Sequence, residues 1–530
     1  MRILLHDFLL SSAQRMPDKV ALRCEDRAIT FAGFASAASA LAATLRRQGV
    51  RRGDRVMLFM DNSIEMAVAV FATSMAGGVF VPVNPTTKAD KLGYLIGDCA
   101  PRVLIAGQSL ARVVRGSGLP GGSVSAIIWH GGPPASPILA DRELTWGQAM
   151  EAALDAPEPA LIDPALIDQD LACIIYTSGS TGDAKGVMLT HRNITNTAWA
   201  ISTYLGNVPS DVVLCVLPMS FDYGLYQVVT GARVGFTVVL SNFFAYPWRV
   251  IETMAAHRVT GLPGVPTLFA QLLQLTSFEG QDLSALRYLT NTAAALPPAH
   301  IRRLCAQFPQ ARLFSMYGLT ECTRVSWLDP ARLHDKIGTV GQGMPNSEVY
   351  VIGADGCRLP PGEVGELVVR GAHVMRGYWR KPEATARRLR DGEIAGEKVL
   401  HTGDLFRMDE EGFLTFVGRV DDIFKCRGEK VSPKEVERVL CEMPGIAEAA
   451  VVPVPDAIDG MAIKAVVVPV AGVEPPTESA VRLFCRGHLE SYLVPRFVEV
   501  RSGLPRSENG KVRRGLLVSA PPAQEAGAQQ

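Results

Sequence analysis

The chain has 530 residues, a length typical of a protein with two or more domains, each large enough to bury its own core. Hydrophobic residues make up 48% of the sequence and basic and acidic side chains balance at 53 each, which indicates a soluble globular protein and gives no reason to expect binding to nucleic acid or to an anionic membrane. The ten cysteines form no Cys-x-x-Cys pair, so we expect reduced, mostly buried thiols in a cytoplasmic protein.

The N-terminal residues, MRILLHDFLLSSAQRMP, do not predict a signal peptide, because His6 and Asp7 interrupt the apolar run. No later segment reaches about 18 uninterrupted apolar residues, so the sequence predicts no membrane-spanning helix. Residues 54–85 then contain a strand, a helix and a second strand (DRVMLFM, IEMAVAVFATSMAGG and VFVPVNP), with Gly77 and Gly78 ending the helix.

The segment IIYTSGSTGDAKGVMLTHRN, residues 174–193, is rich in glycine and hydroxyl side chains. It does not fit the phosphate loop in which a lysine follows the last glycine before a helix, because Ala184 stands where that glycine would be. The residues after Lys185 alternate between apolar and polar, which predicts strand, turn and strand. A phosphate here would be held by backbone N–H groups, hydroxyls and Lys185, and the alternative is a plain polar hairpin.

Further short apolar runs follow at 211–219, 236–241, 259–275 and 286–290, alternating with amphipathic segments. This pattern is typical of α/β layering, so we predict a large N-terminal domain, residues 1–420, of mostly parallel sheets covered by helices. From about residue 416 the chain becomes strongly charged, and the strands and helix that follow predict a small α+β domain at 421–517. We expect the Pro/Ala/Gln-rich tail at 518–530 to be disordered.

Four separated blocks carry a resemblance to a known family: YTSGSTGDAKGVMLTH at 176–191, MYGLTE at 316–321, HTGDLFRMDEEGFLTFVGRVDDIFKCRGEKVSPKEVE at 401–437, and PRSENGKVRRGLL at 505–517. In order and spacing they resemble the AMP-forming adenylating superfamily of acyl-CoA synthetases, peptide-synthetase adenylation domains and luciferases. The wording around SFDYGL and MYGLTECTR is most similar to bacterial acyl-CoA ligases, including those associated with exopolysaccharide export by exosortases.

The resemblance implies ATP-dependent activation of a carboxylic acid to acyl-AMP, release of pyrophosphate, and transfer of the acyl group to a thiol. The implied cofactors are ATP, Mg²⁺ and CoA, or the phosphopantetheine of an acyl carrier protein. Four alternatives remain open: a ligase that loads an amino acid or aryl acid onto a carrier, a stand-alone fatty-acyl-AMP ligase, a luciferase-like oxygenase, and an inactive binding module.

The resemblance also assigns roles to individual residues. The β- and γ-phosphates would be gripped by one loop, comprising Thr177, Ser178, Gly179, Ser180, Thr181, Gly182 and Lys185. Tyr317, beside Gly318, would lie against adenine, Thr320 would hydrogen-bond the α-phosphate, and Glu321 would hold Mg²⁺. Read alone, Tyr317 and Gly318 are an aromatic packed on a turn glycine, and Glu321 is solvated.

Asp404 would accept both ribose hydroxyls, with Arg419 beside it. Alternatively, Asp404 forms a local turn after Gly403 and Arg419 pairs with an acidic surface residue. At the adenine-side turn, Ala293 and Ala294 stand where the family often has glycines.

Lys511 would lie between the carboxylate and the α-phosphate during adenylation. After that step the small domain would swing about Asp421, so that Gly428 lies against the pantetheine arm. Read without the family, Lys511 is one of several solvated basic residues and Gly428 is an ordinary turn glycine.

The acid would bind near PMSFDYGLYQVV, residues 218–229, where the candidate pocket residues are Phe221, Asp222 and Gly224, with Gly264 from a later segment. Asp222 matches both an ammonium-binding aspartate of amino-acid ligases and the wording of fatty-acyl-AMP ligases, or it caps a helix that starts at Tyr223. The large apolar neighbours are Phe221, Tyr223, Leu225, Phe243 and Phe244. They predict an uncharged acyl chain, with fatty or aryl acids used in preference to α-amino acids.

Overall fold

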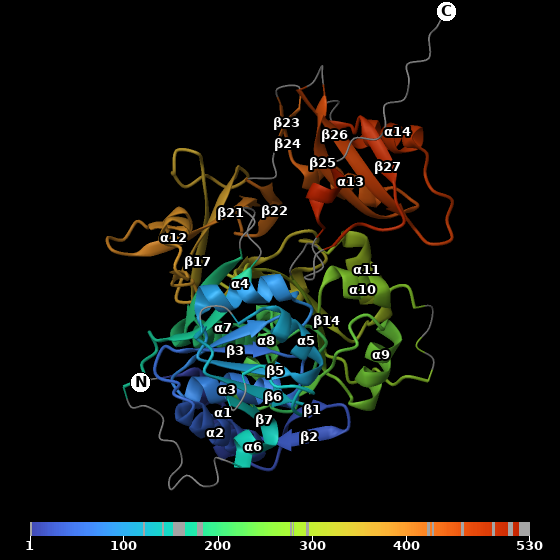
Figure 1. The fold of residues 1–530 in the computed structure, drawn as a ribbon. Helices are drawn as coiled ribbons and strands as arrows, with labels where there is room; N and C mark the ends of the chain where they lie inside the picture. The colour runs from blue at the N-terminus through green and yellow to red at the C-terminus, as the bar shows by residue number, and fades with distance from the viewer. Residues whose placement is uncertain are drawn as a thin grey trace, which may run out of the picture.

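The computed structural model describes residues 3–119, 122–139, 142–151, 165–177, 184–275, 278, 280–292, 296–420, 424–426, 429–456, 460–489, 493–506 and 512–518. Two helix-covered sheets form the larger part of the protein (Figure 1). A smaller sheet follows them in the chain, and a C-terminal α+β unit lies at the top of the same view.

Within the described residues, the first sheet has eight strands in the order β19-β9-β8-β4-β3-β5-β6-β7. They are β3 (Arg55–Phe59), β4 (Val79–Val83), β5 (Val103–Gly107), β6 (Ala126–His130), β7 (Glu143–Thr145), β8 (Leu171–Thr177), β9 (Lys185–Thr190) and β19 (Gly377–Tyr378). The pairs from β8 to β7 are parallel, and β9 is antiparallel to both of its neighbours.

The unit predicted at 54–85 is confirmed, because α3 (Ile64–Met75) joins the parallel strands β3 and β4. Ser63 begins α3 by accepting the N–H of Met66 at 3.1 Å. Gly77 follows the last turn with a φ of +82°, a left-handed conformation that glycine adopts without steric cost.

The second sheet has nine strands among the described residues, in the order β16-β15-β14-β13-β12-β10-β11-β1-β2. They are β1 (Val20–Cys24), β2 (Arg27–Thr30), β10 (Val212–Cys215), β11 (Thr237–Leu240), β12 (Gly261–Gly264), β13 (Tyr288–Asn291), β14 (Arg312–Tyr317), β15 (Ser326–Trp327) and β16 (Gln342–Gly343). All pairs from β1 to β14 are parallel, as predicted. The N-terminal strand β1 is inserted beside β11, with Leu22 opposite Val238.

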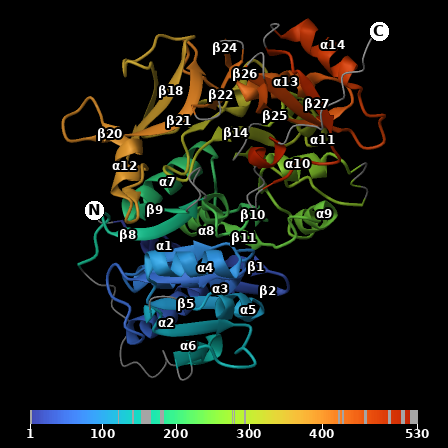
Figure 2. The same cartoon turned by 45° about the horizontal axis from the view of Figure 1, so that its top comes forward.

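Helices cover both sheets and also lie between them (Figure 2). They are α1 (Leu5–Arg15), α2 (Phe31–Arg47), α4 (Ala89–Cys99), α5 (Ala111–Gly116), α6 (Trp146–Glu151), α7 (His191–Tyr204), α8 (Asp222–Val234), α9 (Pro247–Ala256), α10 (Pro266–Leu272) and α11 (Pro298–Gln307), with a short 3-10 turn, η1 (Gln108–Leu110). Helices α1, α2, α3, α7 and α8 contact one another and strands of both sheets, so they form the middle layer. Their shared core includes the fully buried Phe34 and Phe71, whose rings meet edge to face at 5.3 Å.

A third, antiparallel sheet runs in the order β17-β18-β21-β20, with β22 added to β21. Its elements are β17 (Ser347–Ile352), β18 (Val364–Gly371), β20 (Leu389–Asp391), β21 (Lys398–Met408) and β22 (Leu414–Arg419), with α12 (Pro382–Arg388) before β20. In the β21–β22 register Asp404 stands opposite Arg419, so the sheet brings two predicted site residues together.

The C-terminal unit combines sheets and helices, as the sequence predicts. It comprises β23 (Phe424–Cys426), β24 (Glu429–Val431), α13 (Pro433–Glu442), β25 (Ile446–Asp456), β26 (Gly460–Pro469), α14 (Glu478–His488), β27 (Phe497–Val500) and the 3-10 turn η6 (Arg514–Leu517). Ser432 donates a hydrogen bond of 2.6 Å to the Val417 carbonyl of β22, which joins this unit to the third sheet. The domain boundary at 420/421 remains a prediction, and both Asp421 and the tail from residue 519 lie outside the described residues.

None of the ten cysteines forms a disulfide; six are buried and Cys357 is exposed, which agrees with the predicted mostly buried thiols. No helix in the described part of the chain has the length and apolar character needed to cross a membrane.

Two buried histidines have pKa values well below the ordinary range. His191 begins α7, and its Nδ1 accepts the N–H of Leu5 at 3.1 Å; burial, aided by the nearby His6, lowers its pKa to about 4. His373, in the loop after β18, is fully buried with no hydrogen-bond partner for either ring nitrogen among the described residues. Burial lowers its pKa to about 4 as well.

These histidines predict a loss of stability in mild acid. An unfolded histidine has a pKa of about 6.5 and gains a proton before the folded one does, so the stabilisation is complete above pH 6.5 and is lost as pH falls toward 4. Each residue should contribute on the order of 3 kcal/mol across that range. The urea midpoint should therefore fall between pH 7 and pH 5, and His373→Leu should shrink that fall. An unchanged pH dependence in the variant would contradict this account.

Candidate active site

The two strands predicted in the glycine-rich segment at 174–193 are present as β8 and β9. Strands β8 and β9 are antiparallel, with Thr177, the last residue of β8, opposite Lys185, the first residue of β9. Helix α7 begins only at His191, after β9, so a strand and not a helix starts at Lys185. The turn residues Ser178, Gly179, Ser180, Thr181 and Gly182 lie outside the described residues, and their roles remain predictions.

The MYGLTE segment leaves the end of β14 in a tight turn. A Cβ added to Gly318 would lie 2.3 Å from the carbonyl oxygen of Thr323, so no larger residue fits without moving the backbone. Glu321 is partly buried and accepts a hydrogen bond of 2.6 Å from the Tyr378 hydroxyl. Its own carbonyl accepts the Met375 N–H at 2.7 Å. The alternative of a freely solvated Glu321 is therefore wrong.

Tyr378 links the first two motifs and was not identified from the sequence. Lys185 Nζ lies 5.7 Å from the centre of the Tyr378 ring, while the hydroxyl of that ring holds Glu321. Burial and the nearby Glu321 carboxylate raise the pKa of Tyr378, so its hydroxyl stays protonated and can donate. Nothing in the surrounding sequence, MRGYWRKPE, indicates this contact.

Tyr317, Asp404 and Arg419 meet at the junction of the second and third sheets. The Tyr317 hydroxyl donates to Asp404 Oδ2 at 2.6 Å, and Arg419 Nε lies 3.2 Å from Asp404 Oδ1. The Tyr317 ring packs edge to face on Phe406 at 4.8 Å. Asp404 lies within β21 with its carboxylate held from both sides, so a local turn after Gly403 is wrong as its role.

Phe221, Asp222, Tyr223 and Gly224, which we call the acyl wall because the acid is predicted to bind there, lie at the start of α8. Asp222 is the first residue of this helix and Phe221 is its N-cap, so the helix does not start at Tyr223 with Asp222 as its cap. The reason is that the Phe221 carbonyl already accepts the Leu225 N–H, which places the boundary one residue earlier. The Asp222 carboxylate accepts the Tyr223 N–H at 2.9 Å.

The Tyr223 hydroxyl donates to the carbonyl of Thr290, near the end of β13, at 2.9 Å. Gly224 lies in the first turn of α8. Gly264 is the last residue of β12, the strand that pairs with β13. Of the apolar neighbours, Leu225 is fully buried, whereas Phe243 and Phe244 are partly exposed.

The remaining predicted residues, Ala293, Ala294, Asp421, Gly428 and Lys511, lie outside the described residues. Gly428 falls between the paired strands β23 and β24. Thr320 is described and lies next to Glu321, partly buried.

Comparison with known proteins identifies the family. The sequence model of the AMP-binding enzymes matches residues 9–379, more than half of the chain. The chain belongs to the AMP-binding enzyme family. A second model, for the C-terminal domain of these enzymes, matches residues 435–511.

Several known proteins match this AMP-binding enzyme over nearly its whole length. A long-chain-fatty-acid–CoA ligase of Bacillus subtilis is 31% identical over 539 residues, covering 97% of this chain and 94% of the relative. A feruloyl-CoA synthase of Amycolatopsis is 34% identical over 508 residues, covering 95% and 96%. The crystal structure of the anthranilate CoA ligase AuaEII with anthranoyl-AMP matches with a TM-score of 0.87 at 26% identity, covering 97% and 96%.

The site of this AMP-binding enzyme suits a magnesium ion that arrives with a nucleotide. Within the described ranges no three His, Cys, Asp or Glu side chains gather into a complete metal site. Glu321 offers a carboxylate, a ligand type that Mg²⁺ prefers, and Tyr378 fixes the orientation of that carboxylate. Mg²⁺ usually combines one or two carboxylates with phosphate oxygens and water, so Glu321 alone fits such a role.

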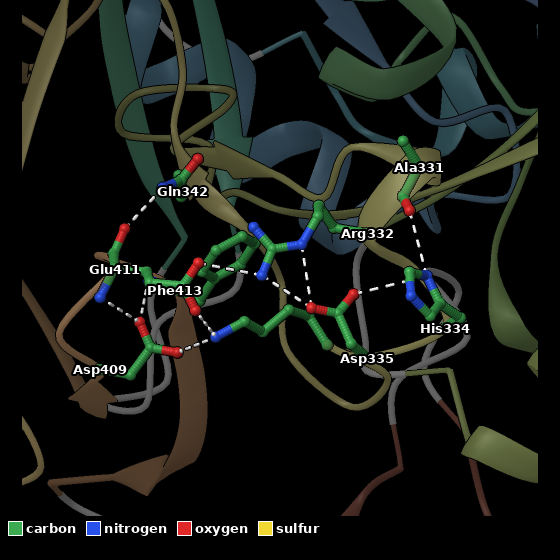
Figure 3. Close-up of polar contacts among 9 residues, drawn as sticks. Ala331, Arg332, His334, Asp335, Gln342, Asp409, Glu411 and Phe413 are labelled. Carbon is green, nitrogen blue, oxygen red and sulfur yellow. Dashed lines mark hydrogen bonds and ion pairs between the residues drawn. The ribbon is translucent and has the colours of Figure 1, made fainter.

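An ion cluster ties the third sheet to the segment that follows the MYGLTE turn (Figure 3). We use this name for Arg332, Asp335, Lys336, Asp409, Glu411 and Phe413. Arg332 follows Pro330 in the short 3-10 turn η4 (Pro330–Arg332) and binds Glu411 at 3.0 Å, while Lys336 Nζ binds Asp409 at 2.7 Å and Glu411 at 2.6 Å. Lys336 Nζ also lies 4.5 Å from the centre of the Phe413 ring.

The ion cluster holds the β21–β22 turn, and this hairpin carries Asp404 and Arg419. We therefore predict that Lys336→Met raises the KM for ATP by about two- to fivefold with little change in kcat, since exposed ion pairs contribute modestly. Molar salt, which screens such pairs, should raise the wild-type KM toward that of the variant.

Lys398→Met is the matched control for this prediction. Lys398 pairs with Asp391 at 2.7 Å on the same sheet, but it does not belong to the ion cluster. An equal rise in the KM for ATP in both variants would contradict a specific role of the cluster.

Proposed function

We propose that this AMP-binding enzyme is an AMP-forming acid–CoA ligase. It activates a carboxylic acid with ATP, releases pyrophosphate, and transfers the acyl group to the thiol of CoA. The observation that carries this proposal is the Asp404 carboxylate, held between Tyr317 and Arg419 at the edge of an aromatic cluster. Such a carboxylate can accept the two hydroxyls of a ribose, and the aromatic ring beside it offers a face to a base.

The first half-reaction joins the acid to AMP. A carboxylate oxygen attacks the α-phosphorus, and the bond from that phosphorus to the pyrophosphate oxygen breaks. Negative charge spreads over the phosphoryl oxygens in the transition state, so catalysis depends mainly on cations and N–H groups that stabilise this charge. Lys185 and the loop that begins at Thr177 would hold the leaving pyrophosphate, Thr320 the α-phosphate, and Lys511 the attacking carboxylate. Mg²⁺ on Glu321 would neutralise phosphate charge.

In the second half-reaction the thiolate of CoA attacks the acyl carbon and AMP leaves. Lys511 is no longer needed, so the small domain would turn about Asp421 and present the β23–β24 hairpin. Gly428, between those strands, would leave room for the pantetheine arm. The free thiols of the chain fit a reducing compartment, and we place the enzyme in the cytoplasm.

A panel of carboxylic acids tests this function. Pyrophosphate release should require ATP, Mg²⁺ and an acid, and adding CoA should yield acyl-CoA and speed turnover. Release of pyrophosphate with no gain from CoA, together with acylation of a phosphopantetheinylated carrier protein, would instead identify a carrier-loading ligase. Oxygen consumption by the enzyme when it is supplied with purified acyl-AMP would identify an oxygenase. No pyrophosphate release with any acid would overturn the assignment as a ligase.

A further inference from the structure

Arg324 is a buried cation close to the predicted acyl site. It lies in the connection between β14 and β15, three residues after Glu321, and only 2% of its surface is exposed. Its guanidinium carbon lies 5.1 Å from the centre of the Tyr223 ring in the first turn of α8. The hydroxyl of Tyr204, at the end of α7, also lies near this cation and donates to Met316 Sδ at 3.1 Å.

No acidic side chain neutralises Arg324 in the part of the chain that the structure describes. Its Nε has no hydrogen-bond partner there, and the guanidinium takes part in no ion pair. Tyr204 cannot serve as the counter-ion, because burial raises the pKa of its hydroxyl to about 12 and keeps it neutral. Arginine itself does not lose its proton in proteins. A buried charge without a counter-ion destabilises the folded protein. An anionic group of a bound ligand would supply the counter-ion that the described residues do not provide.

Tyr223, whose ring packs against the Arg324 guanidinium, belongs to the acyl wall, where the acid is expected to bind. Tyr223 stands between Asp222 and Gly224, and its hydroxyl is fixed on Thr290 of β13. The Arg324 segment also contains Gly318, Thr320 and Glu321, which are assigned to the nucleotide. Arg324 therefore lies between the nucleotide motif and the acyl wall.

We propose that Arg324 is a specificity-determining residue that binds a second carboxylate, at the far end of the acid, so that the substrate is a dicarboxylic acid. This inference rests on the proposed ligase function. One carboxylate of the acid reacts with ATP and the other supplies the missing counter-ion. The planar guanidinium suits this role because its N–H groups match the two oxygens of a carboxylate. A dicarboxylic acid differs from the uncharged acyl chain that the neighbouring aromatic residues predict.

The test measures pyrophosphate release with α,ω-dicarboxylic acids of three to eight carbons and with the monocarboxylic acids of the same lengths. The wild-type enzyme should prefer the best diacid over its monoacid by at least about thirtyfold in kcat/KM, a typical cost of leaving one member of a buried charge pair alone. Arg324→Met should abolish that preference by losing activity on the diacid while keeping or improving activity on the monoacid. Arg324→Lys should retain part of the preference.

Arg233→Met is the matched control. Arg233 is a partly buried arginine at the opposite end of α8 that hydrogen-bonds Ser202 at 2.7 Å, and its loss should not change the preference. Thermal melting of each variant separates misfolding from altered selectivity. A wild-type enzyme that uses monoacids as well as diacids, or an Arg324→Met enzyme that loses both equally, would overturn the inference but leave the ligase function standing. No activity on any acid would instead overturn the ligase function.

Discussion

Replacing Lys511 with alanine should slow acyl-AMP formation by about 10²–10³-fold, the usual cost of removing one preorganised donor from a transition state. Thioester formation from synthetic acyl-AMP should survive, because in the proposed mechanism the lysine acts on the attacking carboxylate and on the α-phosphate only in the first step. The two half-reactions are measured separately, as pyrophosphate release without CoA and as acyl-CoA formation from purified acyl-AMP.

Arg513→Ala is the control for Lys511→Ala. Arg513 is an exposed cation two residues further along the chain, so its removal takes the same charge from the same segment. It should leave both half-reactions near the wild-type rates. If Lys511→Ala slows both half-reactions equally, the proposal that each half-reaction uses its own domain arrangement is wrong.

Asp404→Ala should have an effect of similar size but of a different kind. Hydrogen bonds to a charged group contribute roughly 1.5–3 kcal/mol each, so a carboxylate that accepts two ribose hydroxyls should account for about 10²–10⁴-fold in kcat/KM for ATP. The ribose is also part of acyl-AMP, so the second half-reaction should fall as well, which distinguishes this variant from Lys511→Ala.

Two further variants sharpen the Asp404 test. Asp391→Ala removes an exposed carboxylate from β20 of the same sheet and should leave ATP use unchanged. Asp404→Asn keeps the shape of the side chain but loses its charge, so it should fall between alanine and wild type. If Asp404→Ala leaves the KM for ATP unaltered, the ribose does not bind at this carboxylate.

The layers of the fold follow from local features of the sequence, but the order of the strands does not. The β3-α3-β4 unit is predictable because a buried parallel strand is a short apolar run and because Ser63 and Gly77 mark the two ends of the helix. The placement of β1 beside β11 depends on the pairing of distant segments, which no local pattern encodes. The alternative in which Asp222 caps a helix starting at Tyr223 is wrong by one residue, because the Phe221 carbonyl, rather than the Asp222 side chain, decides that boundary.

The candidate site divides in the same way. The pairing of Thr177 with Lys185 follows from the alternation of apolar and polar residues on either side of a turn. The hydrogen bond from Tyr378 to Glu321 joins residues 57 positions apart. The contact between Arg324 and Tyr223 joins the β14–β15 connection of the second sheet to helix α8. Such contacts depend on the packed arrangement of the sheets, so they appear only in the structure.

The position of β1 also has a consequence during synthesis on the ribosome. Its parallel partner β11 ends at Leu240, and α1 packs on α8, so the first 30 residues leave the ribosome long before their partners exist. At 5–20 residues per second, this delay is on the order of 10–40 s. During that interval β1 can pair with β2, but its other edge lacks β11 and α1 lacks its contact with α8. The N-terminal segment therefore exposes an unpaired strand edge and apolar side chains during synthesis, which favours aggregation unless a chaperone covers them.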